Sequence, residues 1–302
     1  MDQGTTAVVT GSTNGIGEAI ARQLAAAGME VVLVGRDRGR LAAARERITA
    51  AVPGARLRDE LADLSLLEDV RQLADRLRDT RIDILISNAA VVAELGDHTA
   101  EGLQRTLATN HLAPYLLLRT LGENIAAAGG SARLIVVGAS PTALRRVPAN
   151  LEDLGFENPR GLGFPPSFRP FVAYGQTKNM NAMFVYSLAE HLAGSGVTVN
   201  GAHPGIIRHT GLGRDSARGL LRVFGWSQWI NPLLPGPDAG ADTPVWLATA
   251  PELAGVTGRF FVRRKDVPTA AHTTEPGRRA ELWAKSAHLT GLPARRRRAL
   301  DG

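Results

Sequence analysis

Tyr174 and Lys178 are the two residues of this chain best placed for proton chemistry. They are four positions apart in a pattern that predicts a helix from Tyr174 to His191, and residues i and i+4 share one face of a helix. A tyrosine ordinarily has a pKa near ~10, and a nearby cation favours its ionised form. Lowering that pKa to about 7 takes roughly 4 kcal/mol of differential stabilisation. The pair therefore predicts a general acid or base at Tyr174, with Lys178 lowering its pKa.

A glycine-rich turn near the N-terminus has the spacing of a dinucleotide-binding turn. Between an apolar strand pattern at 6–10 and a helical pattern at 15–27, the chain reads Thr10-Gly11-Ser12-Thr13-Asn14-Gly15-Ile16-Gly17. Gly11 can make the tight turn, Gly15 lets the backbone approach a pyrophosphate, and Gly17 permits close packing of the helix on the sheet. The N-terminus of the helix offers its N–H groups to the phosphates. We expect a dinucleotide to bind there.

The end of the second predicted strand bears on which dinucleotide binds. The chain reads Gly35-Arg36-Asp37 at this point. A carboxylate at the end of this strand usually holds a ribose 2′-hydroxyl, whereas an arginine suits a 2′-phosphate. Gly35 leaves the acidic position empty, and the guanidinium of Arg36 can grip a phosphate with two hydrogen bonds. The pattern predicts NADP(H); Asp37 keeps NAD(H) open as an alternative.

Apolar runs and helical patterns alternate along the chain, which fixes the expected fold. The predicted strands are 6–10, 31–34, 56–61, 82–86, 134–137, 197–201 and 258–262, and the predicted helices are 15–27, 41–51, 66–77, 103–127, 174–191 and 238–249. This alternation predicts a parallel sheet with helices on both faces. We expect one α/β domain over residues 1–302, a Rossmann-type doubly wound parallel sheet of about seven strands.

Two segments depart from the alternation and predict the substrate side of the site. Residues 141–172 are rich in Gly and Pro and too long for an ordinary connection, so we expect an irregular lid or insertion. Its Phe164, Phe168 and Phe171 could form an apolar wall, and residues 211–236 a second substrate lid. These residues indicate a hydrophobic or bulky carbonyl substrate, although packing on the core or on another subunit explains them equally well.

The composition of the chain limits which kinds of site, compartment and partner the protein can have. The chain has 302 residues, 44% of them hydrophobic, and no Cys, which excludes disulfides, thiol nucleophiles and thiolate metal ligands. Without a signal peptide or an apolar run of membrane-spanning length, we expect a cytoplasmic protein with no membrane span. The net charge of +6 includes Arg295 to Arg298 in a basic tail at 293–302. We expect that tail to be a solvated terminus, without a nucleic-acid partner.

Several motifs together resemble the short-chain dehydrogenase/reductase family over essentially the whole chain. They are T-G-x-x-x-G-I-G at the first turn, N-A-A after the fourth predicted strand, N-H-L on the long helix and Y-x-x-x-K later. Finer detail resembles the branch of retinol dehydrogenases and related carbonyl reductases, and this detail lies in Thr109-Asn110-His111-Leu112, Val197-Thr198-Val199-Asn200, His203-Pro204-Gly205 and Glu281-Leu282-Trp283-Ala284-Lys285-Ser286.

The resemblance implies roles in binding the cofactor. Besides the turn from Thr10 to Gly17 and Arg36, the implied cofactor contacts are Asp63, Leu64, Asn88, Ala89, Ala90, Tyr174, Lys178, Pro204, Gly205, Ile207 and Thr210. Asp63 corresponds to a residue beside the adenine, and Ala90 stands where the family usually has glycine. An ordinary turn aspartate is the alternative for Asp63. Thr210 is one place beyond the position of the family's carboxamide contact, which His209 occupies.

The resemblance also implies a catalytic group of Asn110, Ser140, Tyr174 and Lys178. Tyr174 would protonate the substrate oxygen, Ser140 would hydrogen-bond it, and Asn110 would position a relay water. Lys178 would lower the pKa of the tyrosine and hold the nicotinamide ribose. Ser140 needs one extra residue after the fifth strand to reach its position, where Ala139 would otherwise fall, and Thr142 is a second choice.

The expected reaction is hydride transfer between a nicotinamide and a small-molecule carbonyl or alcohol. A catalytically idle NADP(H)-binding sensor or scaffold, a nucleic-acid binder using the basic tail and a sugar epimerase remain as alternatives. In the family, subunits commonly pair through the helices that here correspond to 103–127 and 174–191. A homodimer or homotetramer is therefore expected but not required.

Overall fold

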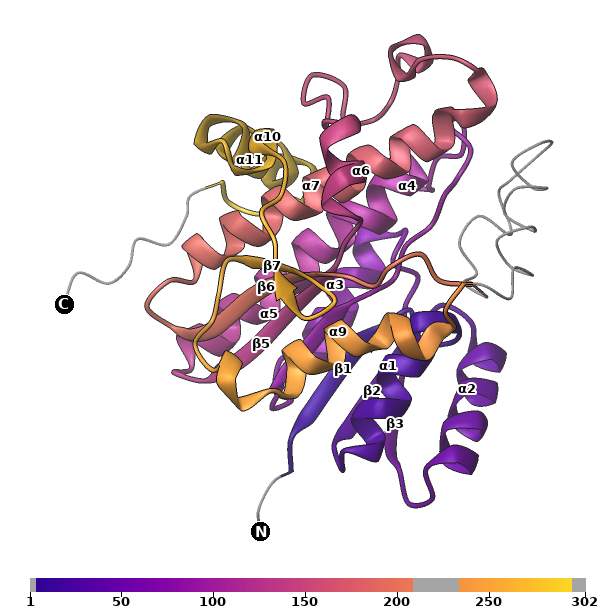
Figure 1. The fold of residues 1–302 in the computed structure, drawn as a ribbon, viewed down its shortest axis with the longest axis vertical. Coiled ribbons are helices and arrows are strands. Elements are labelled where there is room, and N and C mark those ends of the chain that lie inside the picture. Colours follow the sequence, from indigo (N-terminus) through magenta and orange to yellow (C-terminus); the bar gives the residue numbers. More distant parts are fainter. Residues whose placement is uncertain (1–3, 209–233, 295–302) are drawn as a thin grey trace.

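The computed structural model describes residues 4–208 and 234–294 of the chain. Its centre is an eight-stranded sheet in the order β3-β2-β1-β4-β5-β6-β7-β8 (Figure 1). The strands are β1 (Thr6–Thr10), β2 (Glu30–Gly35), β3 (Arg56–Leu61), β4 (Ile84–Ser87), β5 (Ser131–Val137), β6 (Gly196–His203), β7 (Arg259–Val262) and β8 (Lys265–Asp266). Neighbouring strands are parallel except β7 and β8. The predicted doubly wound sheet is confirmed, with the short β8 as an unforeseen addition.

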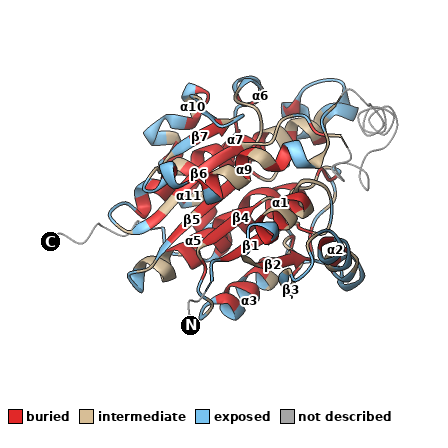
Figure 2. Ribbon diagram, turned by 60° about the horizontal axis from the view of Figure 1, so that its bottom comes forward, coloured by how far each residue is buried: buried red, intermediate tan, exposed pale blue. Residues whose placement is uncertain are grey.

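Helices cover both faces of this sheet, as the alternating pattern predicted. One face carries α1 (Gly15–Ala26), α2 (Arg38–Ala51) and α9 (Pro237–Thr249), and the other carries α3 (Leu67–Leu77), α5 (Ala113–Ala127) and α7 (Arg169–His191). Val8 packs against the face that carries α3, α5 and α7, and its neighbour Val9 packs against the face that carries α1, α2 and α9. Successive residues of a strand point to opposite faces of the sheet. The central strands, such as β1 and β4, are accordingly buried (Figure 2).

The helix predicted at 103–127 is three joined pieces. It consists of α4 (Arg105–Leu107), a π-helical turn η1 (Ala108–Leu112) and α5. Pro114 lies just beyond the π turn, and a proline has no N–H to complete a regular helical ladder. Such π turns are frequent at functional sites, and this one contains Asn110.

The helix that carries Tyr174 begins earlier than predicted, at Arg169 rather than at Tyr174. Pro170 stands in its first turn, where a proline is favourable because the N–H it lacks would be unpaired there. Tyr174 and Lys178 are therefore inside the helix and not at its end. This position gives them a fixed backbone on which to share a face.

The segment 141–172, expected to be an irregular lid or insertion, is partly helical, and its role as a lid stays a prediction. It contains α6 (Pro141–Arg146) and the 3₁₀ helices η2 (Pro159–Leu162) and η3 (Pro166–Phe168). Buried apolar side chains join it to the core on the α7 side, namely Ala149, Leu151, Leu154, Phe156 and Leu162. Phe164, in contrast, is 89% exposed and Phe168 43% exposed. Of the second predicted lid, residues 211–233 lie outside the described residues.

The last helices of the described chain pack on α7. The short α10 (Ala271–Thr274) is followed by α11 (Pro276–Thr290), which packs against α7 through Leu282, Trp283 and Ala287 (Figure 1). Within α5 and α7 the only exposed residues are Ala127 and Glu190. The pairing of subunits through these two helices stays a prediction.

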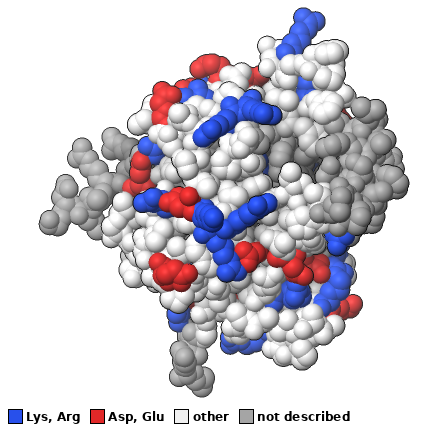
Figure 3. Space-filling model, in the orientation of Figure 1, with Lys and Arg blue, Asp and Glu red and all other residues white. Residues whose placement is uncertain are grey.

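The distribution of charge on the surface and the apolarity of the helices are relevant to the expected absence of nucleic-acid and membrane partners. On the face shown in Figure 3, Lys and Arg side chains lie among Asp and Glu side chains rather than apart from them. Ion pairs such as Arg45–Asp59 and Arg76–Glu60 contribute to this mixture. None of the helices in the described ranges combines the length and apolarity needed to cross a membrane.

Candidate active site

The glycine turn between β1 and α1 is shaped by the end of β4. Gly11 has a left-handed φ of +66°, and a Cβ there would lie 2.9 Å from the Cα of Ala89. A Cβ on Gly17 would lie only 2.2 Å from the carbonyl oxygen of Gly11. The side chain of Asn88 donates from Nδ2 to the carbonyl of Thr10 at 3.1 Å. Both glycine positions must lack a side chain for the backbone to pack this closely.

The N-terminus of α1 fits a phosphate group. Asn14 is the exposed N-cap residue, and its side chain makes no capping hydrogen bond to the helix. The N–H groups of the first turn therefore keep their capacity to bind an anion. Gly15 and Ile16, both half-buried, begin the helix. Ser12 faces away from this end, because its N–H and its hydroxyl both donate to the carbonyl of Val34 in β2.

The end of β2 has no room for an acidic side chain at position 35. A Cβ on Gly35 would lie 2.6 Å from Cγ2 of Thr13 in the glycine turn. Asp37 is the N-cap of α2, where its Oδ1 accepts a hydrogen bond from the N–H of Arg40 at 2.8 Å. Its carboxylate therefore already has a structural partner. Arg36 lies between the two and is exposed.

The residues expected near the adenosine half lie at the ends of β3 and β4. Asp63 is half-buried, and its Oδ1 accepts a hydrogen bond from the N–H of Ser65 at 2.9 Å. This bond is that of a turn aspartate, and it leaves the second carboxylate oxygen available to a ligand. Leu64 packs at the edge of the core. Asn88 and Ala89 donate their N–H groups to Oγ1 of Thr10, and Ala90 is half-buried beside them.

The residues expected on the nicotinamide side follow β6. Gly205 adopts a φ of +88°, and Pro204 is half-buried. A Cβ on Gly240 of α9 would lie 2.9 Å from Cγ1 of both Ile16 and Ile207. The structure thereby brings Ile207 next to the first turn of α1, as one continuous cofactor site requires. Thr210 lies outside the described residues.

Lys178 is buried and is held at the end of β5. Its Nζ donates to the carbonyl of Val137 at 3.1 Å and lies 5.4 Å from the centre of the Tyr174 ring. Burial lowers the pKa of Lys178 to about 8. The pair does share one face of the helix, as the spacing predicted.

The expected lowering of the Tyr174 pKa is not found. Burial raises the pKa of Tyr174 to about 12, because a phenolate is poorly solvated in this environment. Lys178 contacts the ring while its ammonium donates to a backbone carbonyl, so the loss of solvation outweighs the attraction of the cation. The phenol is therefore protonated at neutral pH in this state of the protein.

Ser140 caps the helix that follows β5. Its Oγ accepts a hydrogen bond from the N–H of Thr142 at 3.3 Å, and the residue is half-buried. Accepting this bond leaves its own O–H free to donate. Ser140 is three residues beyond Val137, whose carbonyl binds Lys178, so both lie at the same end of the sheet.

The side chain of Asn110 links the π turn both to the chain after β4 and to α7. Its Nδ2 donates to the carbonyl of Val91 at 2.8 Å and to Oγ1 of Thr177 at 3.2 Å. Its Oδ1 accepts from the N–H of Val91 at 2.8 Å. Thr177 in turn donates to the carbonyl of Tyr174 at 2.7 Å. Asn110 thus connects the chain after β4 with the helical turn that carries the tyrosine.

A row of buried polar residues on α7 was missed in the sequence. Gln176 accepts from the N–H of Asn150, Asn179 donates to the carbonyls of Leu144 and Val147, and Asn181 donates to the carbonyl of Asn110. The signal was the run Gln176-Thr177-Lys178-Asn179-Met180-Asn181, which is too polar for a helix facing the core unless each group has a partner.

Known proteins with the same arrangement identify the family. The family profile described as short chain dehydrogenase matches residues 5–150. DnrU of Streptomyces sp. (strain C5), a protein named for daunorubicin C-13 ketoreduction, is 35% identical over 97% of this chain and 94% of its own length. Retinol dehydrogenase 13 of Mus musculus is 32% identical over 96% of this chain and 84% of that protein.

This chain belongs to the short-chain dehydrogenase/reductase family. It is an oxidoreductase of the branch that resembles the retinol dehydrogenases. Among solved structures, a 3-oxoacyl-(acyl-carrier-protein) reductase from Agrobacterium tumefaciens C58 with NADP bound aligns with a TM-score of 0.62 and 27% identity, covering 86% of this chain and 92% of that one. The family binds a nicotinamide cofactor, and the open glycine turn and the uncapped α1 fit that cofactor.

Proposed function

We propose that this oxidoreductase is an NADP(H)-dependent ketoreductase that acts on a bulky, hydrophobic carbonyl compound. The placement of Tyr174 and Lys178 carries the proposal. They share one face of α7, and Nζ of Lys178 is bound at the end of β5, the strand end that leads into Ser140. In an open α/β sheet, ligands bind at this end of the strands.

In the proposed reaction, the bound nicotinamide supplies the hydride. Tyr174 then gives its proton to the carbonyl oxygen. A pKa of about 12 suits this step, because the phenol is fully protonated before the reaction at neutral pH. Ser140 directs its free O–H at the same oxygen and stabilises the charge that develops there. The ammonium of Lys178 stabilises the phenolate left behind.

The end of β2 supports NADP(H) as the cofactor. Gly35 has no space for the acidic side chain that would hold a ribose 2′-hydroxyl, and Asp37 is engaged as the cap of α2. Arg36 is the first of the exposed cations that follow β2, at the edge where a 2′-phosphate would lie. The NADP bound in the Agrobacterium reductase agrees with this assignment.

The proposed substrate is a ketone on a large apolar molecule. DnrU is named for reduction of a daunorubicin ketone and the mouse relative for retinol, and both names denote bulky molecules with a large carbon framework. Phe164, Phe168 and Ile206 are large apolar side chains that stay exposed in this chain.

The test is NADPH oxidation by the purified protein with a panel of bulky aromatic and aliphatic ketones. Tyr174→Phe should lower kcat at least about a hundred-fold, because it removes the proton donor. Tyr186→Phe is the matched control, since this tyrosine lies on the same helix and its hydroxyl bonds Thr269. Full activity of Tyr174→Phe would contradict the assignment. NADPH binding without turnover of any ketone would favour the idle sensor instead.

A further inference from the structure

Three buried polar side chains and one backbone carbonyl, from four residues, form a continuous line from the C-terminal helix to the π turn. Oγ of Ser286 in α11 lies 2.8 Å from Nε2 of His111, and Nδ1 of His111 lies 3.1 Å from Oδ1 of Asn181. Nδ2 of Asn181 lies 2.8 Å from the carbonyl oxygen of Asn110. None of the four is more than 2% exposed. They connect a residue near the end of the chain with a residue of the proposed site.

The chemistry of the groups fixes the direction of each hydrogen bond. Asn181 donates its amide hydrogen to a backbone carbonyl, so its Oδ1 is the end that faces the histidine and must accept. His111 therefore carries its proton on Nδ1 and accepts at Nε2 from the hydroxyl of Ser286. Every member donates toward Asn110, and each donor has one acceptor.

The carbonyl of Asn110 needs this external donor for a reason visible in the sequence. In a regular α-helix it would accept from the N–H of residue 114. That residue is Pro114, which has no N–H. Asn181 supplies the donor instead, from the neighbouring helix. A carbonyl oxygen has two lone pairs, so one remains for a further partner.

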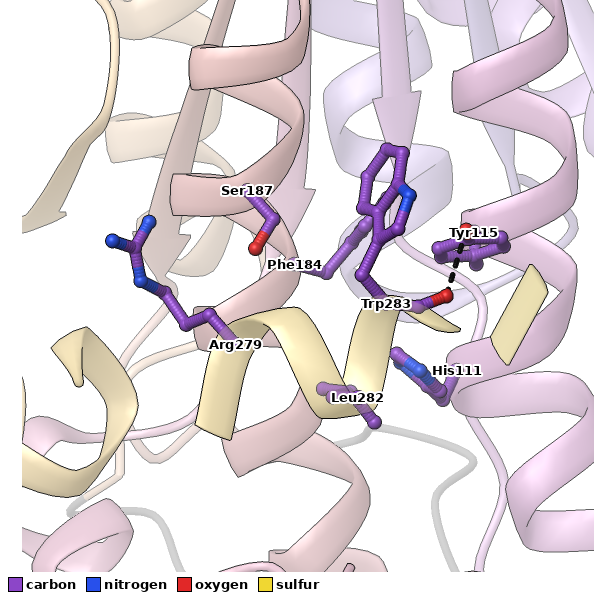
Figure 4. A pocket seen from close by; sticks show the side chains of 7 residues that line it. All are labelled: His111, Tyr115, Phe184, Ser187, Arg279, Leu282 and Trp283. Carbon is purple, nitrogen blue, oxygen red and sulfur yellow. Dashed lines mark hydrogen bonds between the residues drawn. The ribbon is translucent and has the colours of Figure 1, made fainter. Parts of the chain in front are cut away.

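The surroundings keep His111 neutral and fixed. Its ring lies 6.2 Å from that of Tyr115 and 6.3 Å from that of Phe184, measured between centroids. Figure 4 shows these side chains together with Trp283 and Leu282 of α11. Burial lowers the pKa of His111 to about 4, so the ring is uncharged at neutral pH. A neutral ring is what the assigned donor and acceptor roles require.

We propose that His111 is a positioning residue of the active site, acting with Ser286 and Asn181 to aim the carbonyl of Asn110 at the proton-relay water. The inference rests on the ketoreductase function proposed above. It makes α11 a working part of the site, because Ser286 orients the ring that orients the amide. None of the three positioning residues touches substrate.

The test compares variants along this line in the full-length enzyme with NADPH. His111→Leu should lower kcat roughly 10- to 100-fold, since it leaves Oδ1 of Asn181 without its hydrogen-bond donor, and the KM for NADPH should not change. Ser286→Ala should have a smaller effect in the same direction. His111→Asn should restore much of the rate, because its Nδ2 can take the place of the Nδ1–H donor.

Ser187→Ala is the matched control. Ser187 is also buried and lines the same pocket as His111 (Figure 4), but its Oγ has no hydrogen-bond partner among the described residues. This variant should keep the wild-type kcat. A misplaced relay should also raise the solvent deuterium isotope effect on kcat in His111→Leu, a change that a loss of folded protein would not produce.

A measurement without turnover tests the same assignment. The ¹⁵N shifts of the His111 ring at pH 7 should report a neutral ring with its proton on Nδ1, and an Nε2–H ring would overturn the inference. So would wild-type kcat and isotope effect in folded His111→Leu. If the wild-type protein turns over no ketone, the proposed function fails first, and the positioning role fails with it.

Discussion

The glycine turn at the start of α1 and the polar turn of α7 (residues 176–181) both hold separate segments of the chain together, but by different means. In the first, the backbone itself forms the site, and the absence of a Cβ at Gly11 and Gly17 lets three segments meet. In the second, side chains form the contacts, and Asn179 and Asn181 of α7 each bind the backbone of another segment. The glycine turn is therefore disrupted when a side chain is added, and the polar turn of α7 is disrupted when a polar side chain is removed.

The largest effect is expected at Gly17. In Gly17→Ala the new Cβ meets the Gly11 carbonyl at 2.2 Å and the Asn88 amide at 2.5 Å, so the turn must open. We expect NADPH affinity to fall at least about a hundred-fold or the protein to lose about 1–3 kcal/mol of stability, the scale of other overpacked sites. Calorimetric titration with NADPH and urea denaturation measure the two outcomes.

Gly96→Ala is the control for this change, because a Cβ at Gly96 has nothing within 4 Å. It should leave both NADPH affinity and the free energy of unfolding near their wild-type values. Wild-type NADPH affinity in Gly17→Ala would mean that the turn tolerates an added methyl and that its backbone is not the determinant we describe.

The next largest effect is expected at Asn179 in the polar turn. Asn179→Ala leaves the carbonyls of Leu144 and Val147 without their donor and removes the partner of His272. The free energy of unfolding should fall by about 2–3 kcal/mol, since buried groups lose their partners. The KM for ketone should rise, because these carbonyls belong to the segment before α7, while the KM for NADPH should not.

A half-buried asparagine near the end of α5 provides the comparison. Asn124→Ala should change the free energy of unfolding by less than about 0.5 kcal/mol, because alanine is favourable in a helix and the site is partly solvated. Equal losses in Asn124→Ala and Asn179→Ala would show that the amide of Asn179 has no special role.

Lys178 allows the stability cost of a buried ammonium to be compared with the need for that ammonium in turnover. An unfolded lysine has a pKa near ~10.4, and burial lowers the pKa of Lys178 to about 8. Between these values the unfolded chain holds a proton that the folded chain has released, so stability rises with pH across this window. Below it, the buried ammonium destabilises the fold by roughly 3 kcal/mol.

Lys178→Met should therefore abolish turnover and yet raise the free energy of unfolding at pH 7. The gain should be about 1–2 kcal/mol once the lost bond to Val137 is subtracted, and it should vanish near pH 10. Urea denaturation at several pH values measures it. Lys285→Met, at a half-buried lysine paired with Glu281, should show no gain. A Lys178→Met protein less stable than wild type at pH 7 would contradict the penalty.

The same contrast explains what the sequence could predict. The strands, the doubly wound order and the glycine turn follow from local patterns, because apolar runs and glycine spacing act over a few residues. The face shared by Tyr174 and Lys178 also follows from helical spacing. Local patterns were therefore sufficient for the parts that the backbone determines.

The parts that failed depend on distant residues. The pKa of Tyr174 is set by burial, which the spacing of Lys178 does not reveal. The order within 141–172 depends on Leu151, Leu154 and Phe156 reaching the core, and the two-residue β8 is too short to give a pattern. Asn181 and His111 are seventy residues apart in sequence, so their bond could not be predicted from either segment alone.

The smallest effect is expected at the end of β2, where backbone and side chain meet. Arg36→Ala should weaken NADPH binding about ten-fold and leave NADH binding unchanged, because only NADPH carries the 2′-phosphate. Asp37→Ala should cost about 1 kcal/mol of stability by removing the cap of α2, without changing the cofactor preference. Titration of both variants with both cofactors separates the two roles. Equal losses for NADH and NADPH in Arg36→Ala would assign this arginine to general attraction, and the preference for NADPH would then have to come from the glycine turn itself.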